Sequence, residues 1–434
     1  MKARRDAQEK AASLRAYVAF VGLAVLAGKV VLASRLEQGI WIDGDGLRRA
    51  TEITAMATYG VAAPGIDALT AGYATIVHVA GVVVGATELW PIALLQSAFF
   101  SFAVWYMTVA LLRTRVSWAT VPLAYLILLN PALSLSTLAL SGDSVTASLL
   151  MLAVGQLIRD IATDRADRRP RSILITAVLL SLAALIEPTL AVGSIAFLLS
   201  WAAARGNREQ AIWISSGALA LLLALPLLLL VRNQIANNSA ALPASSSQGT
   251  SSGFVTGQTD RCGIGSLDVV SLNGSTFDCL MTWYREKSAS TSEAAMPNAV
   301  AFWSPWVGPL ADPSVRDNPW VALQPMNLLD GSHDSPSIVD SPIASIVSWL
   351  WVLACVIPMA VGFLTLRGLG DLETEISVAA GWLIAGSWLV GVLTHADSSS
   401  RLPVMGMALL LQLLGWRFML TRGREPSRDP FAPA

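Results

Sequence analysis

Two aspartates, Asp43 and Asp45, lie in the polar segment 41–49, which follows the first apolar stretch of the chain. Gly44 and Gly46 are typical turn residues, so the segment is also consistent with a solvated acidic loop. Neighbouring carboxylates can take up a proton or bind a hard cation. We interpret residues 41–49 as one wall of an active site and expect catalytic roles for Asp45 and Asp43.

Four further ionisable residues stand at the ends of apolar stretches: Asp143, Glu187, His395 and Arg401. Each of them is consistent with a helix that simply ends at the membrane interface, and Asp143 is also a candidate N-cap. Ionisable groups within membrane helices are costly and mark functional sites by default. Because all four fall at the same membrane face as the aspartate pair, we expect them to converge on one site.

Composition indicates which elements must position these residues. The chain has 434 residues, of which 54% are hydrophobic and 14% charged, and its mean hydropathy is +0.57. A soluble domain carries about 25% charged residues. Charge-free stretches such as 91–112, 211–231 and 341–366 exceed the roughly 20 residues that a helix needs to cross a bilayer. The sequence therefore predicts an all-α, polytopic membrane protein with about ten or eleven transmembrane helices and one large outer loop.

The distribution of Lys and Arg predicts the orientation. Basic residues predominate in segment 1–15, which places the N-terminus in the cytoplasm and makes 17–34 an uncleaved anchor. Residues 36–70 then lie outside, in an inner (plasma) membrane, with the site on the extracytoplasmic face. Residues 71–112 hold two apolar segments where the topology requires one net crossing. Either 71–87 is short or re-entrant, or Arg113 and Arg115 lie outside.

The alternation of apolar and polar segments divides the chain into three parts. Residues 1–231 form an N-terminal transmembrane module that includes the acidic outer loop 36–70, and residues 342–434 form the last helices and a cytoplasmic tail. Between them, 232–341 is a polar outer region far longer than an ordinary connection. Its tryptophans, Trp303 among them, predict a packed cap, and an oxidising compartment favours a disulfide between Cys262 and Cys279.

Several short motifs in this order resemble the GT-C class of membrane glycosyltransferases, the group that includes protein O-mannosyltransferases and aminoarabinose transferases. The matching stretches are Gly44-Asp45, Ala71-Gly-Tyr-Ala74, Asn130-Pro131, Ser141-Gly-Asp143 and Arg401-Leu-Pro403. The resemblance covers residues 15–190 best and the last 40 residues weakly. The chain departs from the pattern at Ala71 and Ala74, which stand where the family has proline. It also departs at Arg49, where the family has tyrosine, and at Glu187, where many members have arginine.

The resemblance implies transfer of a sugar from a polyprenyl-phosphate donor to a glycan, lipid or protein acceptor, with inversion at the anomeric carbon. Asp45 is then the expected general base, Asp43 its alternative, and Asp143 orients hydroxyl groups.

On the substrate side, the resemblance implies that Arg401, with His395, neutralises the leaving phosphate. We expect Glu187 and Tyr73 to contribute to substrate binding. The donor's lipid tail would lie between helices, so the bilayer itself is an expected partner.

No cofactor or metal is expected, because the three cysteines and three histidines show no metal-ligand spacing. The net charge of −1 argues against a nucleic-acid partner. Two other functions remain open from the sequence: a polysaccharide polymerase or ligase, and a lipid-linked glycan transporter.

Overall fold

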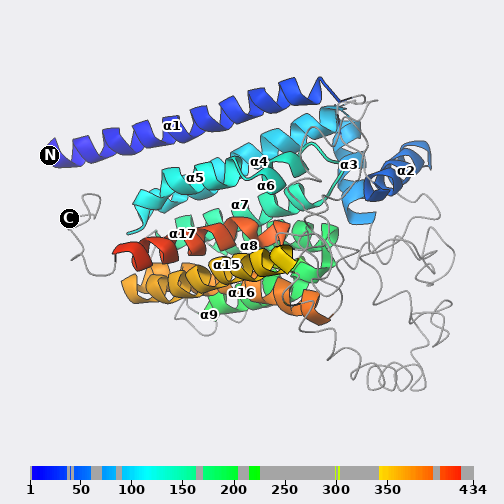
Figure 1. The fold of residues 1–434 in the computed structure, drawn as a ribbon. Helices are drawn as coiled ribbons and strands as arrows, with labels where there is room; N and C mark the ends of the chain where they lie inside the picture. The colour runs from blue at the N-terminus through cyan, green and yellow to red at the C-terminus, as the bar shows by residue number, and fades with distance from the viewer. Residues whose placement is uncertain are drawn as a thin grey trace, which may run out of the picture.

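The computed structural model (Figure 1) describes residues 2–36, 40, 44–59, 71–84, 90–162, 170–203, 215–224, 299, 302–303, 342–393 and 401–421. Throughout these residues the secondary structure is helical, with no β-strand, which confirms the all-α prediction. Five of the described helices are long and apolar enough to cross a membrane, and six shorter ones are apolar. The chain is therefore built as a multi-pass membrane protein, while the total of ten or eleven crossings stays a prediction.

The helices of the first half are α1 (Lys2–Ala33), α2 (Gly44–Tyr59), α3 (Ala71–Val84), α4 (Trp90–Ala110), α5 (Thr120–Leu128), α6 (Pro131–Ser136), α7 (Asp143–Ile161), α8 (Pro170–Ile186) and α9 (Ala191–Ala203). Those of the second half are α15 (Pro342–Leu369), α16 (Asp371–Leu393) and α17 (Met405–Thr421). The domain limits proposed near residues 231 and 341 fall outside the described residues.

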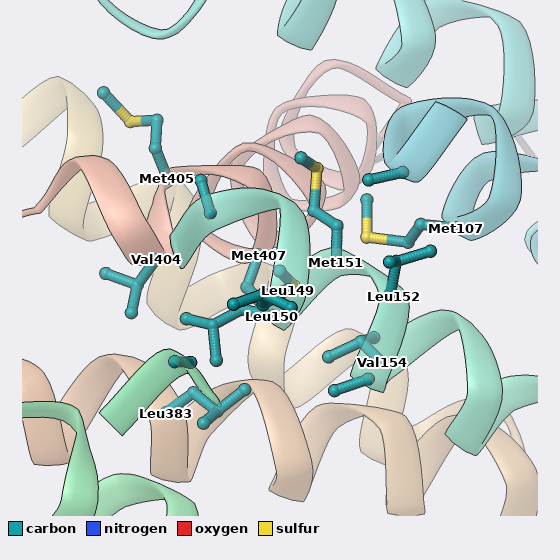
Figure 2. Packing of buried hydrophobic residues seen from close by; sticks show 14 of the residues in the cluster. Met107, Leu149, Leu150, Met151, Leu152, Val154, Leu383, Val404, Met405 and Met407 are labelled. Atoms are coloured by element: carbon teal, nitrogen blue, oxygen red, sulfur yellow. The ribbon is translucent and has the colours of Figure 1, made fainter. Parts of the chain in front are cut away.

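Helix α7 is the centre of the bundle. Of its membrane-length window 83% is buried, against 28% for α1, which lies at the edge (Figure 1). Figure 2 shows Leu149 and Leu150 of α7 packed beside Met407 of α17 and close to Leu383 of α16. An element buried on all sides holds its first residue, Asp143, in a defined position.

Polar contacts show that α1 and α4 run antiparallel. At one end of the pair, the Trp105 indole donates to the Arg15 carbonyl at 3.3 Å. Towards the other end, the buried Lys29 ammonium donates to Thr137 Oγ1 at 2.9 Å and lies 4.9 Å from the centroid of the Phe100 ring. Lys29 thus joins α1 to α4 and to the segment that leads into α7.

Helix α3 lies across the end of the bundle where α1 ends and α4 begins, with α2 beside it (Figure 1). It has 14 residues and is therefore about 21 Å long, shorter than a ~30 Å hydrocarbon layer. This arrangement supports the first of the two alternatives for residues 71–112, a short segment followed by a single crossing. We call this end of the molecule the α3 end.

At the opposite end of the bundle, a hydrogen bond from a backbone amide to a side-chain carboxylate joins the two halves of the chain. The amide of Arg115, in the turn between α4 and α5, donates to Glu373 Oε1 of α16 at 2.9 Å, and the Arg115 guanidinium bonds to the Leu369 carbonyl. Glu373 is buried, so this contact fixes the end of α15 against the first half.

Candidate active site at the α3 end of the bundle

Five polar side chains from five elements meet at the α3 end. Arg49 comes from α2, Tyr73 from α3, Gln96 from α4, Asp143 from the start of α7 and Glu187 from the residue after α8. We call these residues the carboxylate cluster. No two of its members are closer than 23 positions in the sequence, so only the packing of the helices assembles it.

Tyr73 lies at the centre of the cluster. It is only 2% exposed, and the Arg49 guanidinium carbon lies 5.3 Å from the centroid of its ring. The Gln96 side-chain amide donates to the Tyr73 hydroxyl at 3.0 Å. A buried tyrosine hydroxyl needs such a partner, and Gln96 is a polar residue placed within an otherwise apolar helix for this contact.

Asp143 is the first residue of α7, and the N-cap is Gly142 without a side-chain cap. The alternative interpretation of Asp143 as an N-cap is therefore wrong. The Ser141 hydroxyl donates to Asp143 Oδ2 at 2.6 Å. A negative group in the first turn of a helix also lies near the positive end of the helix dipole.

The segment that precedes Asp143 is held from two sides. The Gln96 side-chain amide donates to the Ser141 carbonyl at 3.3 Å, and Arg49 Nη1 donates to the Leu140 carbonyl at 3.4 Å. Side-chain bonds to buried backbone carbonyls limit the movement of a turn. The same two side chains thus contact Tyr73 and position the turn that carries Asp143.

Glu187 completes the cluster. The Thr189 hydroxyl donates to Glu187 Oε1 at 2.8 Å. Burial raises the pKa of Glu187 above its usual value of 4.5; the Asp143 charge raises this pKa further, whereas the Thr189 hydrogen bond and the Arg49 charge lower it. The two carboxyl groups and the guanidinium therefore lie within electrostatic range of one another.

Two glycines allow this close packing. A Cβ at Gly72 would lie 1.8 Å from the Leu185 carbonyl oxygen, and one at Gly142 would lie 2.5 Å from Ile186 Cγ2. Neither contact is sterically possible. Glycine at these positions brings α3 and the start of α7 against the end of α8, and so brings Tyr73 and Asp143 towards Glu187.

Three of the residues predicted from the sequence, Tyr73, Asp143 and Glu187, are thus brought together. The sequence did not predict Arg49 and Gln96 as site residues. A signal for each is present in the sequence: Arg49 stands where the resemblance calls for a tyrosine, and Gln96 interrupts the apolar stretch 91–112.

Asp45 lies in the first turn of α2, four residues before Arg49 in the sequence. The interpretation of Gly44 and Gly46 as turn residues is wrong, because α2 begins at Gly44. Asp43 and His395 lie outside the described residues, as do Cys262 and Cys279, so the roles expected for them stay predictions.

Arg401 occupies a different place. It is 4% exposed, Nη1 donates to the Phe302 carbonyl at 3.3 Å, and it lines a cavity of about 240 Å³ together with Asn130 and Trp303. Neither Asp143 nor Glu187 lines this cavity. Trp303 is buried, so the long polar region 232–341 contacts the bundle at this residue.

No family model matches this chain, and no match is found among curated proteins. Within the described residues, no group of three or more His, Cys, Asp or Glu side chains is placed to hold a metal ion. The carboxylate cluster is therefore the main structural guide to the function of this protein.

Proposed function

We propose that this protein is a membrane glycosyltransferase, which moves a sugar from a polyprenyl-phosphate donor to a hydroxyl acceptor (a glycan, a lipid or a protein) at the α3 end of the bundle. The observation that carries the proposal is the meeting of two carboxyl groups, a guanidinium and a buried tyrosine from four separate elements, at the end of an apolar bundle. The Lys and Arg bias of the sequence assigns this end to the extracytoplasmic side.

In the proposed reaction, the acceptor oxygen attacks the anomeric carbon of the donor. The bond from that carbon to the phosphate oxygen breaks, and the electron pair leaves with the polyprenyl phosphate. The acceptor proton passes to a carboxylate. A single displacement inverts the anomeric centre and needs one base, because the phosphate is a good leaving group.

Asp143 is the better supported base, because the Ser141 hydrogen bond holds its carboxylate at the start of α7, within electrostatic range of Tyr73 and Glu187. Asp45, four residues before Arg49 in α2, is the second candidate. Only one of them accepts the proton in a single turnover, and the other would then hold the sugar or acceptor hydroxyls.

The remaining members of the carboxylate cluster can bind the substrates and position the reacting groups. Arg49 can offer N–H donors to the phosphate as negative charge develops on it. Glu187, whose pKa is raised, retains a proton more readily than an exposed glutamate and can donate a hydrogen bond to a substrate oxygen. Tyr73 and Gln96 keep these groups in place.

The direct test is a transfer assay. Purified full-length protein in nanodiscs is incubated with a polyprenyl-phosphate sugar that is radiolabelled in the sugar, together with membrane extract as the acceptor source. The proposal predicts release of polyprenyl phosphate and loss of label from the donor. Movement of intact donor between leaflets, without cleavage of the sugar–phosphate bond, would instead identify a transporter and reject the proposal.

A further inference from the structure

An arginine and a tryptophan stack on each other at the end of the bundle opposite the α3 end. The guanidinium carbon of Arg417, on α17, lies 3.8 Å from the centroid of the Trp118 ring. Trp118 belongs to the 3-10 helix η2 (Ser117–Ala119), between α4 and α5, and α17 contacts both η2 and α5. We call Arg417 and Trp118 the stacked pair.

The stacking holds the guanidinium of Arg417 and leaves its donors unused. Arg417 is exposed, and within the described residues its side chain forms no hydrogen bond and no ion pair. A guanidinium over an aromatic ring is held by its flat face, so the N–H groups along its edge stay available. Such a planar fork matches two oxygens of one phosphate group.

The segments that carry the stacked pair supply no counter-charge. Residues 90–142 and 401–421 include four arginines and no Asp or Glu. Of these arginines, Arg115 bonds to Glu373 and to the Leu369 carbonyl. Arg113, in the same turn as Trp118, is exposed and has no hydrogen bond or ion pair in the described part of the chain. This turn therefore favours a ligand with net negative charge.

The stacked pair lies where the bundle leaves the hydrocarbon of a bilayer. The apolar span Leu402–Thr421 has 20 residues, which is about 30 Å of helix and close to the thickness of a bilayer core. Arg417 stands one turn before the end of this span. Its neighbours Phe418 and Leu420 are 42% and 78% exposed, so lipid surrounds this turn. Arginine and tryptophan side chains at such a depth reach the headgroup layer.

We infer that the stacked pair binds the phosphate of an anionic phospholipid in the adjacent leaflet, with Arg417 as the donor and Trp118 as the platform that orients it. The exposed apolar side chains beside Arg417 favour a lipid as the occupant. Basic sites beside transmembrane helices are a recurrent way of recognising anionic lipids. The Lys and Arg bias of the sequence assigns this leaflet to the cytoplasmic side. The inference is independent of the proposed sugar transfer at the α3 end.

Native mass spectrometry of the purified full-length protein tests this inference. The unaltered protein should retain one phosphatidylglycerol at collision energies that strip phosphatidylcholine. Arg417→Gln should weaken the binding of phosphatidylglycerol about fivefold, since one arginine near a membrane surface contributes a factor of about this size. Arg417→Lys keeps the charge but loses the planar fork, so its loss should be smaller. Trp118→Leu removes the platform and should also weaken the binding.

Two matched controls separate the stacked pair from general effects of charge and apolar surface. Arg35→Gln removes an exposed arginine at the α3 end, and Trp382→Leu removes a tryptophan of α16 that is 47% exposed. Both variants should retain phosphatidylglycerol as the unaltered protein does. Equal retention of both lipids, or unchanged retention in Arg417→Gln, would overturn the inference. So would an equal loss in Arg35→Gln, or displacement of phosphatidylglycerol by millimolar inorganic phosphate, which would identify a site for free anions.

Discussion

The Arg49 guanidinium lies 5.3 Å from the centre of the Tyr73 ring, while Arg49 also donates to the Leu140 carbonyl. One side chain of α2 therefore contacts both α3 and the turn before α7. An arginine over a desolvated ring is attracted by the ring quadrupole. This pair ties the short helices of the α3 end to the buried centre of the bundle, and the arrangement of the carboxylate cluster depends on it.

A double-mutant cycle measures the energy of this pair. We expect Arg49→Met and Tyr73→Leu each to lower the free energy of unfolding in an SDS titration. Because each change also removes the contact between the two residues, the double variant should lose less than the sum, by about 0.5–2 kcal/mol. Exact additivity would show that Arg49 and Tyr73 do not interact in the membrane.

Asp143→Asn tests the proposed base. The amide keeps the size of the side chain but accepts a proton far less readily, so turnover in the transfer assay should fall about 10²–10⁴-fold with little change in donor affinity. Asp371→Asn, an exposed aspartate at the other end of the bundle, should leave turnover unchanged. If Asp45→Asn shows the loss and Asp143→Asn does not, the base is Asp45, and Asp143 holds hydroxyl groups instead.

The raised pKa of Glu187 predicts a pH dependence of stability. Between the usual value of 4.5 and the raised value, the folded protein holds a proton on this group more often than the unfolded chain does. The folding contribution of Glu187 is therefore most favourable at low pH and declines as the pH rises through that interval. Thermal unfolding of Glu187→Gln should show a smaller decline over the same interval. Parallel curves for both proteins would contradict a raised pKa.

Gly72→Ala tests the close approach of α3 to α8. Its added methyl group meets a backbone carbonyl oxygen at 1.8 Å, which cannot be relieved by a side-chain rotation. The variant should lose about 1–3 kcal/mol of stability and also transfer activity, since Tyr73 is the next residue. Gly28→Ala in α1, where a Cβ meets nothing within 4 Å, should instead be neutral or stabilising, because alanine favours helix.

Membrane orientation is tested by cysteine labelling in intact cells. All native cysteines are replaced, and a single one is introduced at Thr58 of α2 or at Thr421, the last residue of α17, both of which are exposed. An impermeant maleimide should label Thr58→Cys directly and Thr421→Cys only after permeabilisation. The reverse pattern would place the carboxylate cluster on the cytoplasmic side.

The class of fold follows from the amino-acid sequence alone. Stretches such as 91–112 must be helical in a bilayer, because hydrocarbon offers no partner to backbone amides and carbonyls, and that requirement depends on composition alone. It also singled out Asp143 and Glu187, since polar residues at the ends of apolar segments stand out against the rest of the chain, while Tyr73 was singled out by the resemblance of its motif. These are local properties that a single sequence reveals.

Which of these residues meet depends on how the helices pack. Arg49 and Gln96 joined the cluster because α3 lies across the bundle end and Gly72 lets it approach α8, a matter of packing between segments remote in sequence. Arg401 carries the same kind of polar signal as Asp143, yet packing directs it into a separate cavity lined by residues of α15 and α17. Helix termini are specified locally, whereas the angle and depth at which helices cross depend on contacts along their whole length.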